Sequence, residues 1–131
     1  MLSLMGALLT DCTRQQDNDA DLRSRIVGTW TTANVNLPDK AEVSAIEATY
    51  RTDGSWASRY TITRGTDSRK QTTSGKWQIE DGSMFEEQTN VDGASVDTRE
   101  QRAGSKILKL NSHEMVLSNW YAPRRVFLRK D

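Results

Sequence analysis

Four aromatic side chains occupy positions from which they could bind a small organic molecule. Tyr50, Trp56, Tyr60 and Trp77 all lie in segments that read as β-strands. Alternate residues of a strand share one face, and a three-residue loop around Asp53-Gly54 would place Tyr50 opposite Trp56. Such rings serve either as an aromatic wall for a ligand or as the filling of a small barrel. The sequence leaves both interpretations open.

A polar hairpin between Met84 and Gln101 is the second candidate for chemistry, because neither of its faces is apolar. If Glu87 and Glu100 point inward, they form a polar sector that would suit a polar or cationic ligand, since a buried carboxylate needs a partner or a raised pKa. The alternative is a hairpin that extends past the core and is solvated on both sides. Glu86 and Glu87 are neighbours on a strand, face opposite ways and therefore cannot act as a catalytic pair.

Several kinds of chemistry are disfavoured by what the 131 residues contain. The single Cys excludes an intrachain disulfide, and the single His excludes a multi-His metal site. No Ser-centred elbow, His–acid pairing or Gly-rich phosphate loop occurs. The 18 basic and 18 acidic side chains cancel, so charge gives no reason to expect nucleic acid as a partner. We therefore expect a protein that is not an enzyme and needs no cofactor or metal.

The first twelve residues have the pattern of a leader. Residues 1–9 are apolar apart from one serine, and this stretch is too short to span a bilayer but has the length of a signal-peptide core. Leu9 precedes Cys12 by three positions, which resembles the lipobox of bacterial lipoproteins. That resemblance implies export, cleavage and lipidation of Cys12, and so a periplasmic or membrane-anchored protein. The alternative is that residues 1–9 pack on the domain and Cys12 is a plain thiol.

The rest of the chain divides into a tether and one domain. Residues 13–23 are polar and acidic with no apolar periodicity, which predicts a flexible tether. From residue 24 to residue 131, β-branched and aromatic segments alternate with turn signals such as Asp53-Gly54, Asp81-Gly82 and Asp92-Gly93. Eight or nine short strands result, and in the last of them Val126 and Leu128 alternate. We predict an all-β, antiparallel up-and-down meander that forms a small barrel or half-barrel.

An ordered set of short motifs resembles the small exported lipocalin-like proteins of bacteria. The set covers about residues 25–130 and consists of Val27-Gly28-Thr29-Trp30, Tyr50-x-x-Asp53-Gly54-Ser55-Trp56, Gly75-Lys76-Trp77-x-Ile79, Ile107-x-x-Leu110-x-x-x-x-Met115-x-Leu117 and Val126-Phe127-x-Arg129. The resemblance implies a lipocalin-like barrel in which Gly28 and Trp30 are structural. It also implies that Trp30 packs across the closed end, with Arg129 or Arg125 against its ring.

Two functions from different classes follow. In the first, the domain is a lipocalin-like binding module of the bacterial cell envelope, and Tyr50, Trp56, Tyr60, Trp77, Glu87 and Glu100 contact a small molecule whose identity the sequence does not give. In the second, the barrel is filled with side chains, and the domain binds another envelope protein through its outer surface or through the polar hairpin. An internal cavity flanked by Trp56, Tyr60 and Glu87 would favour the first function. A packed interior with an exposed apolar patch would favour the second.

Overall fold

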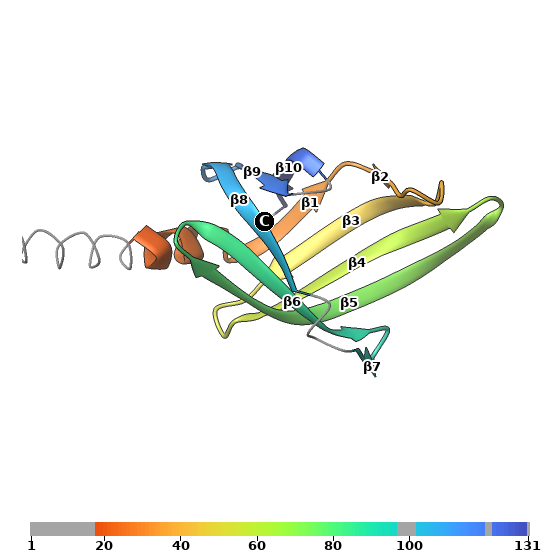
Figure 1. Ribbon diagram of the computed structural model, residues 1–131, viewed down its shortest axis with the longest axis horizontal. Helices are drawn as coiled ribbons and strands as arrows, with labels where there is room; N and C mark the ends of the chain where they lie inside the picture. The colour runs from red at the N-terminus through yellow and green to blue at the C-terminus, as the bar shows by residue number, and fades with distance from the viewer. Residues whose placement is uncertain (1–17, 97–101, 120–121, 131) are drawn as a thin grey trace, which may run out of the picture.

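A computed structural model describes residues 18–96, 102–119 and 122–130. Within them, residues 18–26 form a helix, and every other regular element is a strand (Figure 1). The strands are β1 (Gly28–Thr32), β2 (Val35–Asn36), β3 (Glu42–Tyr50), β4 (Ser55–Arg64), β5 (Asp67–Glu80), β6 (Ser83–Val91), β7 (Ala94–Ser95), β8 (Arg102–Leu110), β9 (Glu114–Asn119) and β10 (Ala122–Arg129). The predicted leader, with Cys12, lies outside the described residues.

The strands close into an antiparallel barrel. Neighbouring strands follow the order β1-β10-β9-β8-β6-β5-β4-β3, and β1 also pairs with β3, so that eight strands form a ring. Closure depends on β1, in which Trp30 lies opposite Arg129 of β10 on one side and opposite Ala48 of β3 on the other. The predicted all-β meander is therefore confirmed, as a closed barrel rather than a half-barrel. Closure leaves these eight strands without an unpaired edge.

Tight turns set the register of the hairpins. At Asp53-Gly54 the amide of Arg51 donates to the carbonyl of Ser55, Gly54 has a φ of +88°, and Tyr50 lies opposite Trp56 as predicted. At Asp81-Gly82 both residues have positive φ, and Glu80 lies opposite Ser83. This is the geometry of a two-residue turn whose twist matches that of the strands. The long β4–β5 hairpin extends beyond the other strands at the end opposite the helix (Figure 1).

Side chains fill the end of the barrel next to the helix. Trp30 is fully buried there, its indole Nε1 donates to the carbonyl of Ile26 at 2.8 Å, and the guanidinium carbon of Arg129 lies 4.2 Å from the centre of its ring. Arg129 also donates to the carbonyl oxygens of Val27 and Ser112, each at 3.0 Å. The expected placement of Trp30 is thus confirmed, and of the two arginines proposed for its ring it is Arg129 that stacks there. Gly28 has a φ of +137°, a backbone conformation open mainly to glycine.

The helix corrects the predicted tether over residues 18–23. Its Asp19 carboxylate accepts hydrogen bonds from the amides of Asp81 and Gly82, at 3.0 and 2.9 Å. Its Arg23 donates to the carbonyl of Thr52 at 3.0 Å and lies 4.9 Å over the ring of Trp77. A polar composition over residues 18–23 is compatible with this role because Asp19 and Arg23 reach backbone groups of the barrel, while the apolar contact comes from Ile26, which is fully buried at the end of the helix. In the described part of the chain, this helix is too short and polar to cross a membrane.

Candidate functional site: a cavity in the open half of the barrel

The half of the barrel away from the helix contains a cavity of about 870 Å³. Its floor consists of buried core residues, among them Tyr50, Trp56, Leu117 and Phe127. The fully buried side chains beneath them, such as Trp30 and Met84, belong to the same core but do not reach the cavity. The barrel is therefore filled at one end and open at the other, and its aromatic residues both fill the core and line the cavity.

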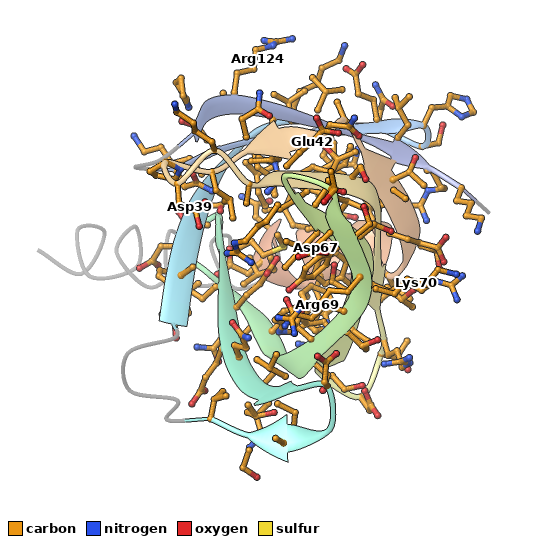
Figure 2. All side chains as sticks on the ribbon, turned by 90° about the vertical axis from the view of Figure 1, so that its right-hand side faces the viewer. Asp39, Glu42, Asp67, Arg69, Lys70 and Arg124 are labelled. Atoms are coloured by element: carbon orange, nitrogen blue, oxygen red, sulfur yellow. The ribbon has the colours of Figure 1, made fainter. Side chains whose placement is uncertain are left out.

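The mouth of the cavity is formed by the segment that links β1 to β3. Residues 34–38, which include the short strand β2, line the cavity at this end. Figure 2 looks onto this end and shows charged side chains of both signs around it, including Asp39, Glu42, Asp67 and Lys70. Asp39 pairs with Arg64 at 3.1 Å, and its hydrogen bond from the amide of Ala41 lowers the pKa of its carboxyl group, as does its pairing with Arg64. Charged side chains thus surround this end of the barrel, while the mouth itself includes Val35, Leu37 and Pro38 and the cavity behind it is largely apolar.

Three of the four predicted aromatic residues line the cavity. Tyr50 and Trp56 lie at its floor, and Tyr60 lies farther along β4, where its hydroxyl donates to Gln71 at 3.0 Å. Trp77 does not reach the cavity. Its ring meets Tyr50 edge-on, with centroids 5.3 Å apart, and its Nε1 donates to the carbonyl of Arg51 at 3.0 Å. Trp77 therefore supports the floor from below.

Among the described residues, the carboxylate that faces the cavity is Glu86 and not the predicted Glu87. Glu86 lies opposite Trp77 in the β5–β6 pairing, so both point inward, while Glu87 lies opposite the exposed Lys76. Glu87 instead borders a small recess of about 90 Å³ between β5 and β6. The second predicted carboxylate, Glu100, lies outside the described residues.

Glu86 is held by the aromatic floor. The hydroxyl of Tyr50 donates to its Oε1 at 2.5 Å. Burial raises the pKa of the Glu86 carboxyl group, while the hydrogen bond from Tyr50 and the positive charge of Arg125 act in the opposite direction. The net result is a carboxyl group that holds its proton to a higher pH than an exposed glutamate does.

Arg125, one of the two arginines that the resemblance offered as partners for the Trp30 ring, lies in the cavity instead. It lines the cavity together with Phe127, and its guanidinium carbon lies 5.0 Å from the centre of the Phe127 ring. Its neighbour Arg124 is exposed and points away from the barrel (Figure 2). In the part of the lining that the structure describes, mostly apolar walls thus combine with neutral polar side chains, one permanent cation and one carboxyl group. The described residues contain no cluster of three or more His, Cys, Asp or Glu side chains placed to hold a metal ion.

The raised pKa of Glu86 predicts a pH-dependent stability. The folded protein binds this proton more tightly than the unfolded chain, so the free energy of unfolding falls as pH rises from the ordinary value of 4.5 through the folded-state pKa. Glu86→Gln keeps an acceptor for Tyr50 but cannot ionise. We expect its stability relative to the wild type to increase between about pH 4 and about pH 8, measured by urea unfolding.

The matched control is Glu87→Gln, which removes one carboxylate from the same strand on the face away from the cavity. Its stability relative to the wild type should change much less over that range. An equal pH dependence in the two variants would contradict the assigned environment of Glu86.

The fold matches two solved structures, one of which is described as a lipocalin-like protein. A lipocalin-like protein from Bacteroides uniformis superposes with a TM-score of 0.54 at 13% sequence identity, over 80% of this chain and 98% of that one. An uncharacterized protein from Bacteroides eggerthii superposes with a TM-score of 0.52 at 15% identity, over 79% of this chain and 98% of that one. No family model matches the sequence, and no curated protein matches it. At these identities the likeness concerns the fold, which is a lipocalin-like barrel.

Proposed function

We propose that this protein is a non-enzymatic binding module that holds a small organic molecule in the cavity of its barrel. The cavity itself carries the proposal. Its volume of about 870 Å³ lies within the usual range for small-molecule sites, and mostly apolar walls with a few polar groups are typical of them. The lipocalin-like fold supports a binding role, since an eight-stranded barrel is wide enough to hold one small ligand.

The cavity also favours one of the two functions that the sequence left open. A barrel acting only through its outer surface would have no need of an open half, and the filled-barrel alternative assumed a packed interior. Two large apolar side chains are exposed among the described residues, Leu108 and Leu128, at 53% and 54%. Single exposed leucines are common on soluble proteins. We therefore favour the binding module over a protein-interaction module.

A cavity-filling substitution tests the binding function. Ser58 lies between Trp56 and Tyr60 on β4 and lines the cavity. We expect Ser58→Phe to abolish or strongly weaken binding of the neutral fluorescent probe N-phenyl-1-naphthylamine, because the new ring occupies the space that the probe needs. Binding is measured from the rise in probe fluorescence on titration with the full chain.

The matched control is Thr72→Phe, which adds the same ring at an exposed position on the neighbouring strand β5. This variant should bind the probe as the wild type does. Circular dichroism should show that both variants are folded. If both folded variants then bind the probe like the wild type, or if both lose binding to the same extent, binding in the cavity is contradicted.

We also propose that the protein is exported and tethered to a membrane by lipidation of Cys12. The support is the apolar stretch over residues 1–9 and the position of Leu9 three residues before Cys12. An intact mass of protein purified from the cell envelope tests this proposal. A mass that lacks residues 1–11 and includes acyl chains would support the anchor, and an unprocessed mass would overturn it.

A further inference from the structure

An arginine inside the barrel determines what kind of molecule the cavity accepts. Arg125 lies on β10 next to an irregularity in the β9–β10 register, between Ala122 and Arg125. Such an irregularity re-aims the side chains beside it. Arg125 consequently lines the cavity, and its guanidinium lies against the ring of Phe127. This stacking holds the charged group in one place, as a recognition group requires.

The same cavity contains two donors that lack an acceptor. Among the described residues, the buried side-chain nitrogen and oxygen atoms without a hydrogen-bond partner are Nε of Arg125 and Nε1 of Trp56. Both residues line the cavity. Buried polar groups are nearly always paired, and leaving a donor unpaired costs free energy. Because both of these atoms are donors, the missing partner is an acceptor.

The charges in the cavity favour the same kind of partner. The guanidinium of Arg125 is always protonated, and it forms no ion pair with a described carboxylate. Among the described residues that line the cavity, Glu86 is the one carboxylate, and its Oε1 accepts a hydrogen bond from Tyr50. A cation placed in a largely apolar cavity is stabilised best by an anion that reaches it directly.

Resting on the proposed binding function, we propose that the ligand is an organic anion: an apolar body that ends in a carboxylate or another oxyanion. The head group accepts hydrogen bonds from the guanidinium of Arg125, and the apolar body lies against the aromatic floor formed by Tyr50, Trp56 and Phe127. An oxyanion fits Arg125 because the planar guanidinium presents several donors that match its oxygens.

A series of probes with one tail and three head groups tests this proposal. Decanoate, decan-1-ol and decylammonium are each titrated against the full chain at neutral pH, with displacement of N-phenyl-1-naphthylamine as the readout. We expect decanoate to bind about tenfold more tightly than decan-1-ol, as one charge-assisted hydrogen bond would give. Decylammonium should bind most weakly of the three.

Variants of two adjacent arginines locate the effect. Arg125→Met keeps an apolar stem of similar length, and it should remove the preference for decanoate over decan-1-ol. Arg125→Lys retains the charge and should keep part of the preference. Arg124→Met, which removes the same charge from the exposed neighbouring position, should leave the preference unchanged.

The outcomes separate this inference from the proposed function. Equal binding of decanoate and decan-1-ol would overturn the inference while the binding function stands. Preference for decylammonium would also overturn it and would assign recognition to an ionised Glu86. A decanoate preference that survives in Arg125→Met, or that disappears equally in Arg124→Met, would overturn the assignment to Arg125. If neither the naphthylamine probe nor any of the three alkyl probes binds, the proposed function fails as well.

Discussion

Trp30→Ala is expected to lower the free energy of unfolding by about 3–5 kcal/mol, the usual cost of removing a large buried ring. Trp30 is fully buried at the filled end of the barrel, its Nε1 donates to Ile26, and Arg129 stacks on its ring. The substitution removes the ring on which the helix, β1 and β10 converge. Urea unfolding followed by circular dichroism measures the loss.

A more conservative change at the same position serves as the control. Trp30→Phe keeps a ring in the core but loses the hydrogen bond to Ile26, so it should cost clearly less than Trp30→Ala. A loss below about 1 kcal/mol for Trp30→Ala would contradict the central position of this residue in the core.

The second large effect is expected at a glycine between two strands. A Cβ built on Gly75 would lie 1.8 Å from the carbonyl oxygen of Glu87, which belongs to the backbone of β6. Backbone of a paired strand cannot move away without breaking the ladder, so Gly75→Ala should destabilise the protein by about 3 kcal/mol, as severe overpacking does. Thermal or urea unfolding of the purified variant measures this change.

Gly82→Ala is the control for Gly75→Ala, because a Cβ at Gly82 meets nothing within 4 Å. Its cost should come from the positive φ alone and amount to about 1 kcal/mol. If Gly75→Ala proved no more harmful than Gly82→Ala, the close approach of β5 and β6 at this point would be wrong.

The turn signals in the sequence predicted much of the barrel. Asp53-Gly54 and its flanking aromatics gave the pairing of Tyr50 with Trp56, which the structure confirms. The arrangement at the filled end was implied by the resemblance to lipocalin-like proteins, which left Arg125 and Arg129 open as the partner of the Trp30 ring. The pairing of Tyr50 with Trp56 depends on a local turn and the residues that flank it. It can therefore be predicted from the sequence without knowledge of tertiary contacts.

The orientation of polar strands was harder to predict. Met84, Glu86 and Gln88 point inward on β6, although neither face of the strand is apolar. The sequence did contain a signal, which is the two-residue turn at Asp81-Gly82. Counting outward from this turn along both strands places Glu86, and not Glu87, opposite the inward ring of Trp77. Reading the register from the turn would therefore have found the inward carboxylate where hydrophobic alternation could not.

The orientation of the side chains on the last strand, β10, was also predicted wrongly, for a related reason. Val126 and Leu128 alternate, and this pattern suggests an inward apolar face, yet Leu128 is 54% exposed and Phe127 is buried. Phe127 lies between Arg125 and Arg129, both of which stack on aromatic rings inside the barrel. An arginine that packs its guanidinium on an aromatic ring can point into the barrel. A pattern that divides residues only into apolar and polar ones predicts that the same arginine faces the solvent.

The seam that closes the barrel has a consequence for how the protein folds. Most neighbouring strands are consecutive hairpins that can form quickly, but β1 pairs with β10, and the Thr31–Leu128 contact across this seam joins residues 97 positions apart. A contact of this separation carries a large loop-closure entropy and raises the contact order, which slows folding. During synthesis the meander from β3 to β6 can assemble early. The ring itself closes only once β10 is available to pair with β1, so closure should be the late step of folding.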